Sequence, residues 1–152
     1  MSDFKDDKCI FCTIATGNDP STTLLVDNET VVAFADIKPV AEHHYLVIPK
    51  KNNPHISNVK QLSSNDIDLV NYMKDQGVQL LESKGVDIEQ ALFGFHWPPF
   101  NTVNHLHLHC IAPASDMSFL HRVAFKPGTL WFANVHQTND WLEKHRASSI
   151  NS

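Results

Sequence analysis

The sequence predicts one α+β domain built on an antiparallel sheet of about five strands, with one long helix and a short N-terminal helix. Short β-branched and apolar runs are separated by turn residues, which is typical of strands joined by hairpins. A single longer segment, between Ser63 and Gly85, has apolar residues at helical spacing. The length of 152 residues is the usual size of one compact domain.

The N-terminal half is predicted to hold a short helix, a hairpin and one further strand. These segments are the helix Cys9–Thr16, the hairpin strands Thr23–Asp27 and Thr30–Phe34, and the strand Tyr45–Pro49. Gly17 supplies a stop for the short helix. The long helix follows, because Ser63 or Ser64 can cap its first turn and Gly85 can end it.

The C-terminal half is predicted to add two strands, a rigid loop, a turn and a terminal helix. These segments are the strand Leu92–His96, the loop Trp97–Asn101, the strand Val103–Ile111, the turn Pro127–Gly128 and the helix Asp140–Arg146. We expect residues 1–8 to be a flexible leader, residues 9–146 a single domain and residues 147–152 a flexible tail.

Composition and charge exclude several classes of function. The formal net charge is −5, whereas sequence-independent binding of nucleic acid needs clustered Lys and Arg. No nucleic-acid partner is therefore expected. No apolar run approaches about 20 residues, so no membrane span is expected. The charged N-terminus shows no signal peptide, and three cysteines are typical of a reducing compartment. We therefore expect the protein in the cytoplasm, the nucleus or both.

Histidine is unusually frequent, with ten in the chain, and three of them alternate with leucine in the run His105–His109. In a strand these imidazoles would share one face while the leucines face the core. We expect a half-buried strand with the imidazoles on its solvent side and with pKa values that are coupled and lowered. Such a face could coordinate zinc, or a neutral imidazole in it could attack phosphorus.

The run His105–Ile111 resembles the His-x-His-x-His-x-x motif of the histidine-triad (HIT) nucleotide hydrolases, in which x is hydrophobic. Cys9–Ile14, Ala33–Pro39 and His44–Lys50 have the order and spacing of that family, which implies a HIT-like domain. Gly94–Val103 is most similar to the third histidine-triad nucleotide-binding (Hint) subgroup. This subgroup also resembles the catalytic domain of aprataxin, whose zinc finger we do not expect here.

The resemblance implies a catalytic set of His44, His105, His107 and His109. His107 would attack the α-phosphate and form a nucleotidyl-histidine intermediate, and His44 would lie behind this nucleophile. His109 would contact the phosphate or leaving-group oxygens. Related transferases have glutamine at that position, so His109 favours water as the second reactant.

The resemblance also implies residues that bind the nucleotide. Asp36 would accept from the ribose hydroxyls, although an aspartate before Pro39 can also simply make a turn. Four apolar residues would sandwich the purine, with plain core packing as the alternative; they are Ile10, Phe11, Ile14 and Phe34. Thr102 and Asn101 would lie at the phosphate. Trp97-Pro98-Pro99 replaces an asparagine loop of better-known Hint enzymes and would shape the leaving-group side.

Cys9-x-x-Cys12 is half of a familiar zinc motif. Some family members bind zinc with this pair, a loop histidine and the first triad histidine, which implies Cys9, Cys12, His55 and His105 as ligands of a structural zinc. The alternative is two small buried cysteines on one helical turn. No cofactor is required for the chemistry in either case.

Three functions follow from these residues. The favoured one is a nucleoside phosphoramidate hydrolase that acts on adenylyl-lysine or other AMP–amine compounds through His107. A related version would remove AMP from a carrier by cleaving a P–O or mixed anhydride bond. The alternatives are a zinc metallohydrolase that uses all three triad histidines, and a non-catalytic module that binds a purine nucleotide. The expected ligand is a purine nucleotide like AMP, and the two-fold dimers of Hint relatives imply a homodimer as one assembly.

Overall fold

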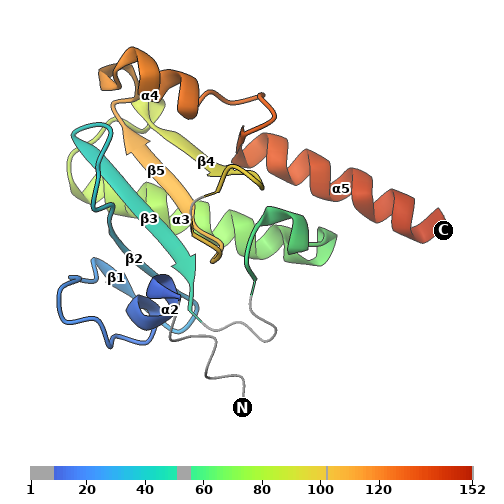
Figure 1. The fold of residues 1–152 in the computed structure, drawn as a ribbon, viewed down its shortest axis with the longest axis horizontal. Helices are drawn as coiled ribbons and strands as arrows, with labels where there is room; N and C mark the ends of the chain where they lie inside the picture. The colour runs from blue at the N-terminus through green and yellow to red at the C-terminus, as the bar shows by residue number, and fades with distance from the viewer. Residues whose placement is uncertain (1–8, 51–55, 102, 152) are drawn as a thin grey trace.

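The computed structural model describes residues 9–50, 56–101 and 103–151, with side chains described as far as His145. A single antiparallel sheet has the strand order β1-β2-β3-β5-β4-β6 (Figure 1). Its strands are β1 (Val26–Asp27), β2 (Val31–Ala35), β3 (His43–Pro49), β4 (Leu92–His96), β5 (Leu108–Ala112) and β6 (Phe132–Asn134). The predicted α+β class is confirmed, but the sheet has six strands instead of about five.

The short N-terminal helix α2 (Ile10–Ala15) is capped by Cys9, whose Sγ accepts the backbone N–H of Cys12 over 3.2 Å. It ends before Gly17, which has a φ of 78° that few other residues adopt. The hairpin of β1 and β2 follows. Its turn is fixed by the Asn28 side chain, which accepts the backbone N–H groups of Thr30 and Val31.

Both faces of the sheet are covered, so its central strands β3 and β5 are buried almost throughout. On β3, Tyr45 and Val47 pack in the larger core cluster under the helices, whereas Leu46 and Ile48 pack with α2 on the other face. The register pairs Leu46 with His109. The alternation therefore puts His109 on the same face of the sheet as α2.

The long helix α3 (Ile67–Ser83) lies across the face opposite α2 (Figure 1). A 3-10 turn, η2 (Ser64–Asp66), leads into it, and Ser63 and Asp66 form a capping box there. Gly77 is needed for close packing, because a Cβ there would lie 2.6 Å from the Sγ of Cys110 on β5. Three further 3-10 turns are η1 (Val59–Gln61), η3 (Ile88–Gln90) and η4 (Ala114–Asp116).

The predicted strand Val103–Ile111 is wrong at its start, because β5 begins only at Leu108. Leu106 donates its N–H to the carbonyl of Ile56 over 2.9 Å instead of to a neighbouring strand. His105 and His107 therefore lie in the irregular segment that leads into β5, and only His109 lies on the strand.

The C-terminal segment adds three elements to the fold: α4 (Phe119–Ala124), the edge strand β6 and α5 (Val135–Asn151). The sequence analysis missed α4, and α5 is longer at both ends than the predicted helix Asp140–Arg146. The structure thus has two long helices instead of one. Figure 1 shows α5 running outward from the sheet to the C-terminus. The predicted leader, residues 1–8, lies outside the described residues.

None of the described helices is long and apolar enough to cross a membrane.

Gly94 on β4 allows β6 to pair with that strand. A Cβ at Gly94 would lie 2.5 Å from the carbonyl oxygen of Ala133 and 2.6 Å from the Phe132 ring, so Gly94→Ala should displace β6. We expect the free energy of unfolding in urea to fall by about 1–3 kcal/mol. Ala35→Val, at an exposed strand end, is the control and should change it by less than about 0.5 kcal/mol. Equal effects in the two variants would contradict the role given to Gly94.

Candidate active site

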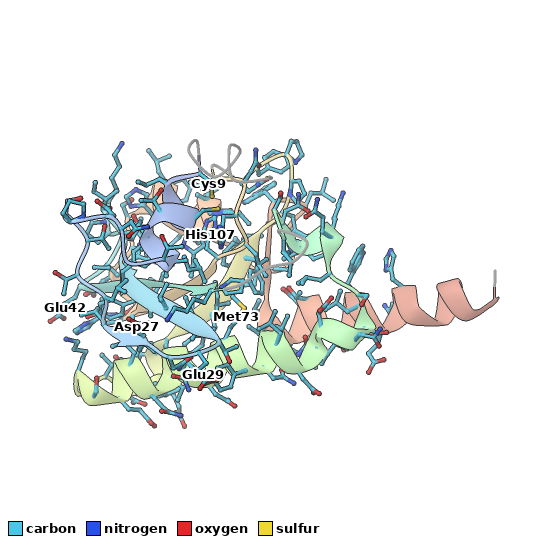
Figure 2. All side chains as sticks on the ribbon, turned by 90° about the horizontal axis from the view of Figure 1, so that it is seen from below. Cys9, Asp27, Glu29, Glu42, Met73 and His107 are labelled. Atoms are coloured by element: carbon cyan, nitrogen blue, oxygen red, sulfur yellow. The ribbon has the colours of Figure 1, made fainter. Side chains whose placement is uncertain are left out.

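The three triad histidines are buried, with 2% of His105, 8% of His107 and 5% of His109 exposed. The predicted solvent-facing row of imidazoles is therefore wrong. The segment 103–107 turns away from the extended path of a strand, and the rings are covered by α2 on one side and by Phe125 after α4 on the other. Figure 2 shows His107 near Cys9, on the side of the sheet opposite Met73 of α3.

The His107 ring is oriented by its own backbone neighbour. Its Nδ1 lies 2.7 Å from the carbonyl oxygen of His105, and because a carbonyl only accepts, Nδ1 carries the proton. The lone pair of the neutral ring is then on Nε2. Burial lowers the pKa of His107, so the ring stays neutral at pH 7. A neutral imidazole with a fixed Nε2 lone pair is suited to nucleophilic attack.

His44 and His109 form a chain of hydrogen bonds that begins at the backbone. The N–H of Val40 donates to Nδ1 of His44 over 3.2 Å, so the proton of neutral His44 is on Nε2. This Nε2–H donates to Nδ1 of His109 over 2.9 Å. The proton of neutral His109 must then be on its own Nε2. His44 thus lies behind His109, and the prediction that it lies behind His107 is wrong.

The Nε2–H of His109 is buried and has no acceptor among the described residues. A buried donor without an acceptor costs about 1–3 kcal/mol, so such a group usually marks a place for a ligand or water. The rings of His107 and His109 are 5.0 Å apart between centroids. A phosphoryl group attacked by His107 would therefore bring oxygens near this donor.

The predicted lowering of the pKa is confirmed for His107 and His109, but its main cause is burial. Burial is the largest cause for His109, followed by the charges of His107 and His44. The pKa of His44 falls to about 4, again mainly through burial and against the opposing effect of Asp36. The site therefore holds neutral, hydrogen-bonding imidazoles at pH 7.

The carboxylate of Asp36, which follows β2, has two contacts among the described residues. Its Oδ1 accepts the N–H of Lys38 over 2.8 Å, which is the turn interaction. Its Oδ2 lies 3.3 Å from Nε2 of His44. The carboxylate is thus next to the chain formed by His44 and His109, and its role as a ribose ligand stays a prediction.

The apolar residues predicted to sandwich the purine occupy two environments. Phe11, Ile14 and Phe34 are buried in one core cluster, whereas Ile10 is 50% exposed. Phe11 also presents its ring to His107, edge to face, with 5.0 Å between centroids. Phe11, Ile14 and Phe34 therefore pack in the core, and Phe11 also lies beside the proposed nucleophile. The contact of all four residues with a purine stays a prediction.

Asn101 lines a small pocket together with His105 and His107. Its side-chain amide donates to Oδ1 of Asn104 over 3.2 Å, which ties the loop before the triad together. Two other predicted site residues, Thr102 and His55, lie outside the described residues.

The sequence analysis gave no role to His96 and Phe125, which complete the site. Nε2 of His96 donates to the carbonyl of Ala124 over 2.8 Å, and the His96 ring lies 5.1 Å from the His109 ring. Phe125 contacts both rings. The high frequency of histidine could have pointed to His96. Phe125 comes from the end of α4, and no local pattern shows where that helix packs.

His105 faces away from His107 and toward the two N-terminal cysteines. Its Nδ1 lies 3.4 Å from Sγ of Cys9 and 3.3 Å from Sγ of Cys12. Around a tetrahedral zinc, with its usual Zn–S and Zn–N bond lengths, sulfur and nitrogen ligands lie about 3.5 Å apart. Nε2 of His105 lies 3.3 Å from the carbonyl oxygen of Pro49, which leaves the Nδ1 lone pair facing the sulfurs. The three side chains therefore fit zinc.

The three triad histidines do not converge on a common ion position among the described residues, since each ring has different partners. Asp36, His44 and His109 also form a group with donor atoms close together. There, however, Nε2 of His44 carries a proton when Nδ1 accepts from Val40, so it offers no lone pair. The geometry disfavours the alternative of a zinc metallohydrolase built on the triad.

Residues 8–124 match the family model described as scavenger mRNA decapping enzyme C-term binding. The adenosine 5'-monophosphoramidase HINT3 of Danio rerio is 44% identical over 147 residues, which cover 95% of this chain and 88% of that protein. The chain belongs to the histidine-triad family. This HIT protein is also 39% identical to HINT3 of Xenopus tropicalis, over 91% of its own length and 89% of the relative's.

A solved histidine-triad protein from Clostridium difficile has the same fold as this HIT protein, with a TM-score of 0.62 and 31% identity. The match covers 68% of this chain and 88% of that structure. The predicted resemblance to the HIT family and its third Hint subgroup is thereby confirmed.

The hydrogen bonds of the site predict which ring nitrogen carries the proton. At pH 7, nitrogen NMR should find His107 neutral with its proton on Nδ1 and His109 neutral with its proton on Nε2. Both rings should remain neutral at pH 6.5, because burial lowers their pKa values. In His44→Phe, the His109 ring should lose its single tautomer, while the His107 ring should keep its own. A proton on Nδ1 of His109 in the unchanged protein would contradict this arrangement.

Proposed function

We propose that this HIT protein hydrolyses nucleoside phosphoramidates of the AMP–amine type, adenylyl-lysine among them, with His107 as a covalent nucleophile. The observation that carries the proposal is the 2.7 Å hydrogen bond that fixes the proton of His107 on Nδ1 and its lone pair on Nε2. The names of its HINT3 relatives support it, since each is called an adenosine 5'-monophosphoramidase.

The reaction takes two displacement steps at the α-phosphorus. In the first step, Nε2 of His107 forms a bond to phosphorus while the P–N bond to the amine breaks, and the departing nitrogen takes up a proton from solvent. In the second step, water attacks the same phosphorus and gives up one proton to solvent, the bond to His107 breaks, and AMP leaves while the His107 ring returns to its neutral form. The Nε2–H of His109 donates to a phosphoryl oxygen in both steps, which stabilises the developing charge.

The chain from Val40 through His44 keeps this donor in place. If the His109 proton moved to Nδ1, Nε2 would present a lone pair to the phosphate and repel it. Hydrogen bonding by His44 excludes that tautomer, and burial keeps His44 itself neutral. His44 is therefore a positioning residue that acts through His109.

The nucleotide is held, in this proposal, by Asp36 at the ribose, by the apolar residues of α2 and β2 at a purine base, and by Asn101 and Thr102 at the phosphate. Adenine is the favoured base, because the relatives' names specify adenosine compounds. The homodimer and the location in the cytoplasm or nucleus stay predictions.

The group of Cys9, Cys12 and His105 is proposed to hold a structural zinc, with His55 as the expected fourth ligand. Zinc bound there would supply folding energy and no chemistry at phosphorus. Its effect on the reaction is indirect. By fixing the His105 ring it would fix the backbone carbonyl that orients His107.

Replacement of the nucleophile tests the covalent step. His107→Ala should lower kcat on an AMP–amine substrate by roughly 10⁴-fold or more, as losses of nucleophiles do elsewhere. Rapid quenching of the unchanged protein with phosphorus-labelled substrate should trap one label per chain on His107. His136→Ala, at a histidine whose side chain is 84% exposed on α5, is the control and should keep full activity.

Full activity of His107→Ala, or label on another residue, would overturn the covalent proposal. Nucleotide binding without turnover of any AMP–amine compound would instead support the non-catalytic module.

Metal content tests the zinc proposal. The purified protein should contain about one zinc per chain, and Cys12→Ser should lose it together with thermal stability. Cys110→Ala, at a buried cysteine outside the group, is the matched control and should retain zinc. If zinc is removed by chelation and the protein molecules that remain folded still turn over substrate, the zinc is structural. Complete loss of turnover in a fully folded, zinc-free protein would favour the metallohydrolase.

A further inference from the structure

Two thiols lie close together at the start of α2 and take no part in the proposed chemistry at phosphorus. The Sγ atoms of Cys9 and Cys12 lie within 4.8 Å of each other, and both residues are partly exposed. A disulfide brings its sulfurs to about 2.05 Å, so rotation of the two side chains with a movement of this first turn would join them. Cysteines that respond to oxidants share this arrangement, in which an accessible thiol lies beside a second, resolving thiol.

The third cysteine has the opposite environment. Cys110 is fully buried on β5, where Gly77 of α3 packs against it. Burial raises the pKa of its thiol, which disfavours the reactive thiolate. An oxidant is therefore expected to react at Cys9 and Cys12, and Cys110 serves as an internal control.

The cysteine pair is coupled to the proposed nucleophile through His105. Nδ1 of His105 lies 3.4 Å from Sγ of Cys9 and 3.3 Å from Sγ of Cys12. The backbone carbonyl of the same residue accepts the 2.7 Å hydrogen bond that orients His107. Joining the sulfurs would change both contacts with the His105 ring, and so disturb the residue whose carbonyl sets the His107 tautomer.

A second route runs through Phe11, which lies between the two cysteines in the sequence. Its ring meets the His107 ring edge to face with 5.0 Å between centroids, and its centroid lies 6.2 Å from that of His105. The turn of α2 that must move when the sulfurs join therefore also carries a side chain packed against the nucleophile. A change at the cysteine pair reaches His107 by two separate contacts.

We propose that Cys9 and Cys12 form a reversible oxidation site, at which a disulfide between them disturbs the orientation of His107 and slows its reaction. The oxidant is a peroxide, and a dithiol reverses the step. Formation of the bond is independent of the proposed hydrolysis, and only its effect on turnover rests on that function.

The oxidation consumes one peroxide for each disulfide. One thiol attacks an oxygen of hydrogen peroxide, the O–O bond breaks, and a sulfenic acid and one water form. The second thiol then attacks the sulfenic sulfur, the S–S bond forms, the S–O bond breaks, and a second water leaves. In total the two thiols lose two electrons and two protons, and the peroxide takes up both.

Zinc and the disulfide exclude each other at this site. A zinc ion held by Cys9, Cys12 and His105 needs both sulfurs as thiolates, which a disulfide no longer supplies. Zinc should therefore slow the oxidation, and oxidation should release zinc.

Peptide mapping of the unchanged protein tests the oxidation site. After brief treatment with hydrogen peroxide, alkylation in denaturant and digestion, mass spectrometry should find Cys9 linked to Cys12 and Cys110 alkylated. Dithiothreitol should return all three thiols. Cys110→Ala should form the same link, whereas Cys9→Ser should form none. A link to Cys110, a link between chains or irreversible oxidation of Cys9 alone would contradict the proposal.

Zinc release is the second measurement. With a chromogenic chelator present, peroxide should release one zinc for each link between Cys9 and Cys12, above the amount released by the chelator alone. Added zinc should slow the linkage several-fold. Complete linkage with the zinc retained would overturn the proposed exclusion.

Two readouts at His107 test the coupling. In the linked protein, nitrogen NMR should show that the His107 ring has lost its single tautomer, whereas His109, which His44 orients, should keep its own. Turnover of adenosine 5'-phosphoramidate should fall roughly tenfold or more, because a displacement of about 1 Å can cost about a hundredfold. Dithiothreitol should restore both.

The outcomes separate this inference from the proposed function. If no AMP–amine compound is turned over, the proposed function fails, while peptide mapping and the NMR of His107 still decide the oxidation site. Unchanged turnover and an unchanged His107 tautomer in fully linked protein would overturn the coupling even where hydrolysis is confirmed. Absence of any link between Cys9 and Cys12 after peroxide treatment would overturn the site itself.

Discussion

The orientation of the His107 ring depends on one hydrogen bond, from its Nδ1–H to the backbone carbonyl of His105. That carbonyl is itself held from several sides. The His105 ring is fixed between the Cys9 and Cys12 sulfurs and the Pro49 carbonyl, and the N–H of Leu106 is bound to Ile56. The irregular segment before β5 is therefore rigid without being part of the sheet. A strand in this place would have used the same carbonyl in its ladder.

The same segment explains why the three histidines have different functions although they alternate in sequence. One ring faces the cysteines, one presents a lone pair, and one presents an N–H. All are buried, so their charged forms are disfavoured and each proton position is set by a hydrogen-bond partner. In water the rings would exchange tautomers freely. Burial and distinct partners thus give three chemically identical side chains different roles: His107 is an acceptor, His109 is a donor and His105 is a candidate metal ligand.

Much of the fold could be predicted from the sequence, because hairpins, caps and the amphipathic helix are local features. Ser63, Gly85 and the turn at Asn28 have the expected local roles. The start of β5 could not be predicted, since His105–His109 alternates perfectly and only tertiary contacts of His105 and Leu106 break the strand. The candidate site was predicted through family resemblance. His96, Phe125 and the true partner of His44 depend on how distant segments pack, which no local pattern specifies.

The pairing of β6 with β4 has a consequence for how the molecule meets its surroundings. With β6 in place, the sheet ends in a strand of three residues, and its other edge is the two-residue strand β1. Unpaired backbone groups on long edge strands are templates for strand addition and aggregation, and short edges offer little room for either. The segment 132–134 therefore pairs with the edge of β4 that would otherwise be open. A second copy of this chain would therefore find little edge backbone with which to extend the sheet.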